Sequence, residues 1–197
     1  PEKLVISTIL KREDVRDSFI SRRYSSIADL PLGSVVGTSS LRRKAQLLNK
    51  RKDLKVVEFR GNVQKRLEKL DNNVAVATFL ATAGLNRLGL VELINPISTD
   101  EMLPAVAQGA VGIEHLRSEK MEEFLAPLND SVSKKRVEAE RAFLREVDGS
   151  CRTPIGGLAQ KNNEEFKFMG EIISADGEVK IHDVWQGDWA MAIEIGR

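Results

Sequence analysis

Apolar residues gather in short runs along the first half of the chain, separated by polar and glycine-containing segments. Three of these runs are typical of buried strands, at residues 35–36, 55–59 and 74–80. Residues 41–49 lie between the first two runs and repeat apolar side chains at helical spacing, with Leu41, Ala45 and Leu48 on one face. The alternation of strand and helix predicts a parallel sheet covered by helices, an α/β fold.

A second helix is predicted after Asn62, with Val63, Leu67 and Leu70 as its buried stripe. Upstream of the sheet, residues 5–9 alternate as a strand, and we expect the charged residues 12–23 to be a link to the next unit. Downstream, residues 108–114 are predicted to cross irregularly into another short strand, followed by a helix at 121–128.

The last third of the chain has a different pattern, a long helix followed by strands. We predict a helix over residues 133–147, strands at 155–159, 166–173 and 179–184, and a short terminal helix from 190. Asp176-Gly177 is a hairpin signal between the last two strands. This part is therefore expected to form a small α+β domain with an antiparallel sheet.

Composition narrows the possible classes of protein. The 197 residues carry a net charge of +1 and are 5% aromatic, so we expect no nucleic-acid partner. The sequence contains no run of about 18 apolar residues, which is the length needed to span a membrane. Cys151 is the only cysteine, which excludes an internal disulfide or a multi-cysteine zinc site and favours the cytoplasm. We assign His115 and His182 structural roles and predict no metal site.

Two arginines in the first turn of a predicted helix indicate that an anion binds there. Arg42 and Arg43 fall in the first turn after Gly37-Thr38-Ser39-Ser40, where the helix macrodipole opposes positive charge unless an anion lies among them. Further arginines follow the other strands, namely Arg60, Arg66 and Arg87. Because ligands of open α/β sheets bind beyond the carboxyl ends of the strands, we predict a polyanion site there. Alternatively, Ser40 is a plain helix cap and the arginines are solvated.

Cys151 lies in a glycine-bounded loop between a helix and a strand. A lone cysteine is more often a small buried hydrophobe than a nucleophile. Arg152 beside it would stabilise a thiolate, which favours reactivity.

Six segments in order resemble the porphobilinogen deaminase family, also called hydroxymethylbilane synthases. They are GTSSLRR from Gly37, FRGNVQKRLEKLD from Phe59, AGLNRLGL from Ala83, LPAVAQGAVGIE from Leu103, AERAFL from Ala139 and GSCRTPIG from Gly149. The resemblance implies a transferase of haem biosynthesis that joins four porphobilinogen molecules with loss of ammonia and releases hydroxymethylbilane. It also implies a dipyrromethane cofactor bound to a cysteine by a thioether, and Cys151 matches that position.

The resemblance implies roles for the arginine cluster as well. The positions that match cofactor-binding residues are Thr38, Ser39, Ser40, Arg42, Arg43, Arg60, Gly61 and Arg66. Those that match substrate-binding residues are Arg60, Arg66 and Arg87. The resemblance further implies that Arg42 and Arg43 take part in chain elongation. It also implies that the ligands are porphobilinogen and its linear oligomers.

By the same resemblance, the chain divides into four parts. Residues 1–15 are expected to be a remnant of domain 1 and a hinge, 16–104 domain 2, 105–130 a return into domain 1, and 131–197 domain 3. The first two domains of the family resemble periplasmic binding proteins, and the protein is expected to be a cytoplasmic monomer with no membrane partner.

The family's catalytic aspartate lies upstream of the first residue of this chain. We therefore expect a fragment, shortened also at the end of domain 3, that is inactive alone. Neither Asp14 nor Asp17 is assigned the catalytic role. The alternative function is a non-catalytic module that binds polyanions.

Overall fold

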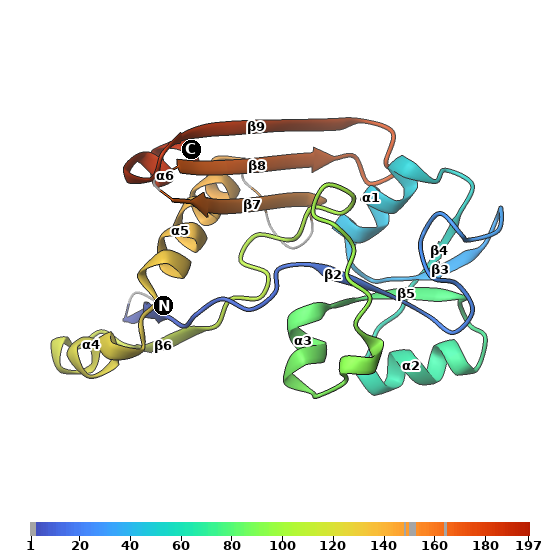
Figure 1. Ribbon diagram of the computed structural model, residues 1–197, viewed down its shortest axis with the longest axis horizontal. Coiled ribbons are helices and arrows are strands. Elements are labelled where there is room, and N and C mark those ends of the chain that lie inside the picture. Colours follow the sequence, from blue (N-terminus) through green and yellow to red (C-terminus); the bar gives the residue numbers. More distant parts are fainter. Residues whose placement is uncertain (1–2, 148, 150–152, 164) are drawn as a thin grey trace.

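The computed structural model describes residues 3–147, 149, 153–163 and 165–197, which form three separate sheets (Figure 1). The largest has four strands in the order β2-β5-β3-β4. Their bounds are β2 Asp17–Ser21, β3 Val35–Gly37, β4 Lys55–Val57 and β5 Ala77–Ala81. β3 pairs in parallel with both β4 and β5, as the alternating pattern predicts.

Strand β2 corrects one expectation, because residues 12–23 are not simply a charged link. β2 pairs antiparallel with β5 and makes the sheet mixed. Charged residues surround this strand, but Phe19 and Ile20 are each only 3% exposed. Two adjacent apolar residues in a strand point to opposite faces, so both faces of the sheet at β2 are buried.

Helices cover both faces of this sheet, as predicted (Figure 1). α1 (Leu41–Lys50) lies on one face, where Leu47 packs with Phe19 and Phe79. α2 (Val63–Asp71) and α3 (Thr82–Arg87) lie on the other, where Leu67 and Leu85 join a second cluster. Two cores therefore sandwich the sheet.

The buried face of α1 differs from the predicted stripe. Ala45 is fully buried, but Leu41 is 37% exposed and Leu48 is only partly buried. The buried polar side chains are instead Arg42, Arg43 and Gln46. Apolar periodicity could not reveal this face, because polar groups line its contact with the neighbouring elements.

A two-stranded ribbon lies apart from the large sheet. β1 (Leu4–Ile9) pairs antiparallel with β6 (Gly112–Leu116), and α4 (Glu119–Leu125) follows with a 3-10 turn at Ala126–Leu128. Two crossing segments connect the ribbon to the sheet: residues 10–16 lead into β2, and the chain returns after the 3-10 turn Val91–Leu93. The crossings are hydrogen-bonded to each other, since the Leu10 and Glu13 N–H groups donate to the Val111 and Gly109 carbonyls at 3.0 and 3.1 Å.

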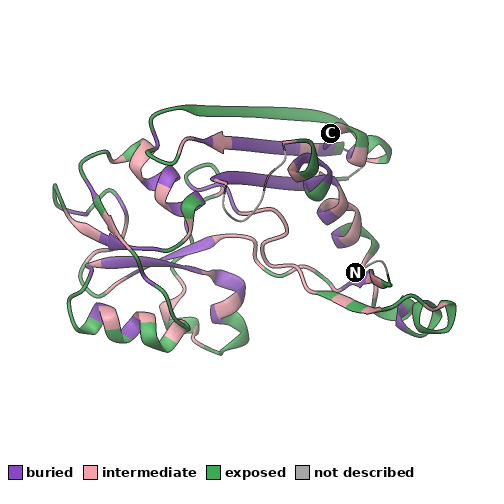
Figure 2. Cartoon of the chain, turned by 180° about the vertical axis from the view of Figure 1, so that it is seen from behind, coloured by how far each residue is buried: buried purple, intermediate pink, exposed green. Residues whose placement is uncertain are grey.

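The last part of the chain forms the predicted α+β unit. β7 (Ile155–Asn162), β8 (Glu165–Ile173) and β9 (Lys180–Asp188) make an antiparallel sheet in sequence order. α5 (Ser131–Glu146) packs on it through Phe143, whose ring meets Phe168 edge-on at 5.2 Å. The chain ends with a 3-10 turn, Trp189–Met191, and α6 (Ala192–Ile195). Figure 2 shows that β9 is exposed along its length, whereas β7 and β8 are largely buried.

In the part of the chain that the structure describes, no helix combines the length and the apolar character needed to cross a bilayer.

Candidate anion-binding site

The carboxyl end of β3 leads directly into α1 through three hydroxyl residues. Thr38 Oγ1 accepts the N–H of Ser40 at 3.2 Å, and Ser40 Oγ accepts the N–H of Arg43 at 3.4 Å. Ser39 Oγ accepts the N–H of Phe59 at 2.9 Å. Ser40 is thus a helix cap, as one of the two interpretations held. The three hydroxyls fix the loop that carries the helix start.

Arg42 and Arg43 share one buried carboxylate, Asp17. Arg42 Nη2 lies 2.8 Å from Asp17 Oδ2, and Arg43 Nη2 lies 2.7 Å from Oδ1. Asp17 is completely buried, and the two arginines are 5% and 9% exposed. The anion that the helix start requires is therefore supplied in part by the chain itself.

Sequence reasoning missed Asp17. We had placed it in a charged link, but it is the first residue of β2. The available signal was the short apolar pair Phe19-Ile20 beside it, which is typical of a buried strand. Its pairing with Arg42 could not be predicted locally, since it depends on β2 joining the sheet edge next to α1.

Electrostatics keep Asp17 charged but leave the site positive. Burial raises the pKa of the Asp17 carboxyl, yet attraction to Arg43 and Arg42 and their hydrogen bonds outweigh it, so the pKa lies below its ordinary value. Two guanidinium groups against one carboxylate leave a net positive charge. Such a surplus in a poorly solvated place attracts a further anion.

Arg42 also reaches the returning segment between the sheet and the ribbon. Its Nη1 donates to the Leu103 carbonyl at 2.7 Å and to Gln46 Oε1 at 3.3 Å, and its Nη2 donates to Gln108 Oε1 at 3.2 Å. Its Nε is buried and has no hydrogen-bond partner among the described residues. A buried donor without a partner is costly.

Arg60 and Arg66 form a more accessible rim after β4. Arg60 is exposed and its Nε lies 2.6 Å from Glu58 Oε1. Arg66 is partly buried, and its Nε donates to the Gly61 carbonyl at 2.9 Å. Burial first, and then repulsion by Arg43, lower the pKa of Arg66, although a guanidinium remains charged. Arg66 therefore adds positive charge next to Arg43, as predicted.

One other predicted position, Arg87, is not brought into this cluster. Arg87 is exposed in the last turn of α3, and no hydrogen bond or ion pair with another described residue involves it. Cys151 and Arg152 lie outside the residues that the structure describes. The roles assigned to these three positions stay predictions.

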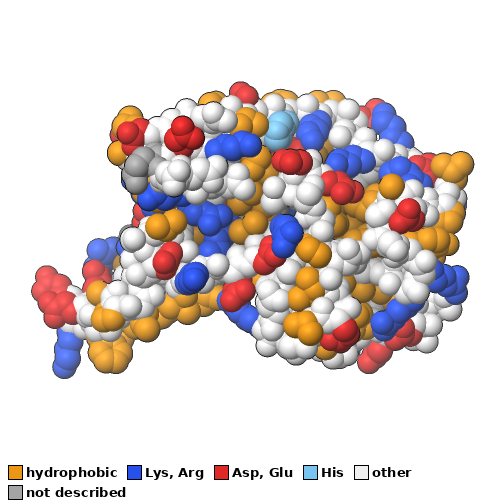
Figure 3. All heavy atoms as spheres, in the orientation of Figure 1, with side chains coloured by type: hydrophobic (Ala, Val, Ile, Leu, Met, Phe, Trp, Pro, Cys, Tyr) orange, Lys and Arg blue, Asp and Glu red, His pale blue; other side chains and the backbone are white. Residues whose placement is uncertain are grey.

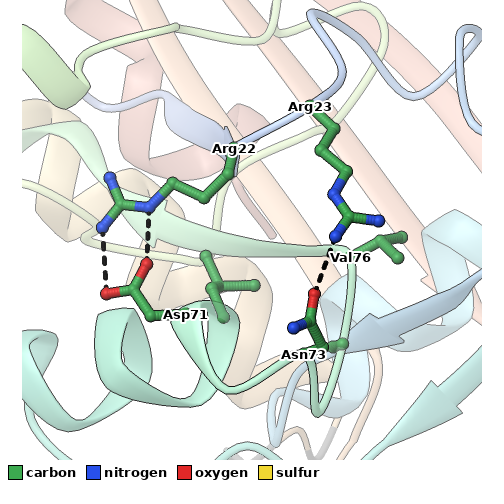
Figure 4. Close-up of a pocket in the computed structure, with 7 residues that line it drawn as sticks. Arg22, Arg23, Asp71, Asn73 and Val76 are labelled. Atoms are coloured by element: carbon green, nitrogen blue, oxygen red, sulfur yellow. Dashed lines mark hydrogen bonds and ion pairs between the residues drawn. The ribbon is translucent and has the colours of Figure 1, made fainter.

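A separate pocket of about 220 Å³ lies at the opposite end of the sheet, before β5. Figure 4 shows that its arginines are already occupied by side chains of the chain. Arg22 Nε lies 2.9 Å from Asp71 Oδ1, and Arg23 Nη2 donates to Asn73 Oδ1 at 3.0 Å. Their position at the amino end of β5 favours the α1 edge as the anion site.

The molecular surface is mixed in charge. Figure 3 shows basic and acidic side chains interspersed on the face drawn, without one continuous basic area. No cluster of metal-ligating side chains occurs within the described ranges. His115 Nε2 is hydrogen-bonded to Ser7 Oγ at 2.8 Å.

The comparisons with known proteins decide the family. Residues 1–123 match the family model described as the dipyromethane cofactor binding domain of porphobilinogen deaminase, and residues 134–197 match its C-terminal domain. The chain belongs to the porphobilinogen deaminase family. The collinear motifs from Gly37 to Gly156 thus reflect true membership of the family.

Several relatives of this family are similar over most of the chain. The porphobilinogen deaminase of Paracoccus denitrificans is 55% identical over 179 residues, which are 90% of this chain and 57% of that protein. That of Nitrobacter hamburgensis is 49% identical over 198 residues, 100% of this chain and 63% of the relative. The chloroplastic enzyme of Pisum sativum is 51% identical over 181 residues, 90% of this chain and 49% of the relative. The chain therefore spans about half to two thirds of these relatives.

Among solved structures, a YaeC-family lipoprotein from Enterococcus faecalis overlaps only partially. The two chains are 14% identical, and the match covers 75% of this chain and 68% of the lipoprotein, with a TM-score of 0.43. The α/β assignment rests on the sheet order and the helices on both faces.

Proposed function

We propose that the chain is the tetrapyrrole-binding part of an enzyme that polymerises four porphobilinogen molecules, with loss of ammonia, into hydroxymethylbilane. The observation that carries the proposal is the surplus of guanidinium groups at the start of α1, where Arg42 and Arg43 share one carboxylate. The growing pyrrole chain bears acetate and propionate groups. Carboxylates of this kind suit both the surplus charge and the fork of donors on arginine.

The dipyrromethane cofactor fits this set of residues. We propose that Cys151 holds it by a thioether, and that the hydroxyl loop at Thr38, Ser39 and Ser40 lies beside its carboxylates. When bound, the cofactor supplies the free pyrrole end to which substrate units are added. In this proposal Arg42 and Arg43 orient the ligand carboxylates for elongation, while Asp17 holds the two guanidinium groups in place.

The rim residues take the outer carboxylates in the same proposal. Arg60, Gly61 and Arg66 lie next to the helix start, and we assign them to cofactor and substrate binding. Arg87 is assigned to substrate binding from its match to the family pattern alone. We further propose a cytoplasmic monomer, in line with the single cysteine.

The intact mass of the native protein tests the cofactor assignment. We expect a mass larger than that of the polypeptide by a dipyrromethane, and a Cys151-containing peptide that a maleimide does not label after denaturation. Cys151→Ala should have the bare polypeptide mass and no activity. A native protein that is fully active, unmodified and labelled by maleimide would contradict the assignment.

Replacing Arg60 tests the rim without disturbing the core. Among the described residues, the Arg60 side chain pairs with Glu58 alone, at the surface. We therefore expect Arg60→Ala to retain its stability and to bind porphobilinogen oligomers about 10-fold more weakly, measured by titration calorimetry. Arg22→Ala is the control, since it removes another exposed arginine that is paired with an acidic side chain, at the opposite end of the sheet. Equal binding by both variants would exclude Arg60 from the site.

A non-catalytic polyanion-binding module is the second candidate. It is favoured by the burial of Arg42 and Arg43, whose contacts with Asp17 hold charge but supply no acid or base to a ligand. Consumption of porphobilinogen by the native protein distinguishes the two, because only the enzyme releases ammonia and hydroxymethylbilane. Binding with no turnover would favour the module.

A further inference from the structure

The hairpin between β8 and β9 lies directly against α1. Gly177 at its tip has a positive φ of 78°, and a Cβ there would come within 2.6 Å of the Asn49 backbone nitrogen. Asn49 Nδ2 donates to the Gly177 carbonyl at 2.8 Å. These contacts therefore fix the position of the hairpin relative to α1, the helix that carries Arg42.

A buried carboxylate of the same hairpin reaches α1 at a second point. Glu171 on β8 is 4% exposed, and its Oε1 accepts Gln46 Nε2 at 2.6 Å. Gln46 Oε1 accepts Arg42 Nη1 at 3.3 Å, and both side chains donate to the Leu103 carbonyl, at 3.0 and 2.7 Å. A continuous chain of hydrogen bonds thus joins the three-stranded sheet to the candidate anion site.

The charge of Glu171 decides how Gln46 is oriented. An ionised carboxylate only accepts hydrogen bonds, so it must face the amide NH2 of Gln46, which turns the amide oxygen toward Arg42. The second carboxylate oxygen of Glu171 faces Lys180 Nζ and lies 3.6 Å from His182 Nδ1, both on β9. The ion pair with Lys180 compensates the charge of Glu171 in its buried place.

We propose that Glu171 is a positioning residue for Arg42, acting through Gln46. Glu171 does not touch the ligand; it keeps an acceptor facing one end of the Arg42 guanidinium while Asp17 holds the other. The assignment rests on the proposed function, because it concerns the ligand-binding geometry of Arg42.

The test is Glu171→Gln in the native protein that carries this sequence. A glutamine at this position can donate as well as accept, so Gln46 is no longer forced to present its oxygen to Arg42. We expect a 5- to 10-fold higher KM for porphobilinogen with a smaller change in kcat, and an unchanged far-ultraviolet circular dichroism spectrum. Gln46→Met, which removes the relay but leaves the Glu171 side chain in place, should raise KM to a similar extent.

Glu178→Gln is the matched control. Glu178 lies on the same hairpin and also faces the end of α1, at 3.6 Å from Lys52, but both side chains are about two thirds exposed. The KM of the Glu178→Gln variant should equal that of the unsubstituted protein. An equal rise in KM for Glu178→Gln would mean that any change of hairpin charge acts on the site, and the specific assignment would be wrong.

A double-mutant cycle separates this proposal from the proposed function. If Glu171 acts through Arg42, Glu171→Gln should have little further effect on KM in an Arg42→Lys background. Additive effects, or an unchanged KM for both Glu171→Gln and Gln46→Met, would overturn the positioning role. If Arg42→Lys itself left porphobilinogen binding and turnover unchanged, the proposed function of Arg42 would fail instead.

Discussion

Asp17→Asn should lower the free energy of unfolding by about 3–5 kcal/mol at pH 7, because it leaves two buried guanidinium groups without their shared negative charge. Asp17 is fully buried and accepts hydrogen bonds from Arg42, Arg43 and Gln108. An asparagine keeps the shape of the side chain but offers one acceptor oxygen and places an NH2 group among donors. Urea denaturation followed by circular dichroism measures the loss.

Asp71→Asn is the control for this prediction. Asp71 also pairs with an arginine, Arg22, but their side chains are 55% and 47% exposed. Solvent screens such a pair, and its removal should change stability by less than about 1 kcal/mol. Equal losses in the two variants would show that the buried pairing of Asp17 adds nothing to stability.

The pH dependence gives an independent check of Asp17. Its pKa in the folded state is below the ordinary value of 3.8, so its stabilising contribution is complete above that value. The contribution is lost as the pH falls through the lower pKa of the folded state. The stability difference between the unsubstituted protein and Asp17→Asn should therefore be constant near neutral pH and shrink below pH 3.8. A difference that grows on acidification would contradict this ionisation.

Glu140→Gln is the second substitution with a large expected effect, again about 3–5 kcal/mol of lost stability. Glu140 on α5 is fully buried and binds both terminal nitrogens of Arg12, at 2.6 and 2.9 Å. It also accepts the N–H groups of Ala107 and Ala159, at 2.7 and 2.9 Å. One carboxylate thus joins α5 to both crossing segments and to β7.

The backbone around Glu140 adds to this expectation. Ala107 has a positive φ of 61°, a conformation that costs a non-glycine residue energy and persists only where contacts hold it. In Glu140→Gln the new NH2 group would face N–H donors of Arg12 and of either Ala107 or Ala159. These donors would share a single acceptor oxygen, and the contact between the last unit and the large sheet would loosen.

Tryptophan fluorescence during urea denaturation measures this change, since Trp189 packs against Phe166 at 5.9 Å in the core under α5. Glu146→Gln is the control on the same helix. Glu146 is exposed in the last turn of α5, and its replacement should stay within about 0.5 kcal/mol. A stable Glu140→Gln variant would mean that the crossings are held by other contacts.

The elements that the sequence predicts correctly are those with a local period. The strands at β3, β5, β7 and β8, the helix α2 and the Asp176-Gly177 turn all follow from spacing within a few residues. The errors occur where polar side chains are buried. Charged neighbours conceal β2, and α1 presents Arg42, Arg43 and Gln46 inward, which no apolar pattern marks.

The sequence by itself determined the strand and helix alternation, the guanidinium groups at a helix start and the family motifs, because each is written in neighbouring residues. Only the tertiary structure decided what those guanidinium groups meet. Asp17 stands 25 residues before Arg42, and Glu171 stands 125 residues after Gln46. Ionic and hydrogen-bond partners at such separations are chosen by how β2 and the β8–β9 hairpin pack against α1, and no local propensity encodes that packing.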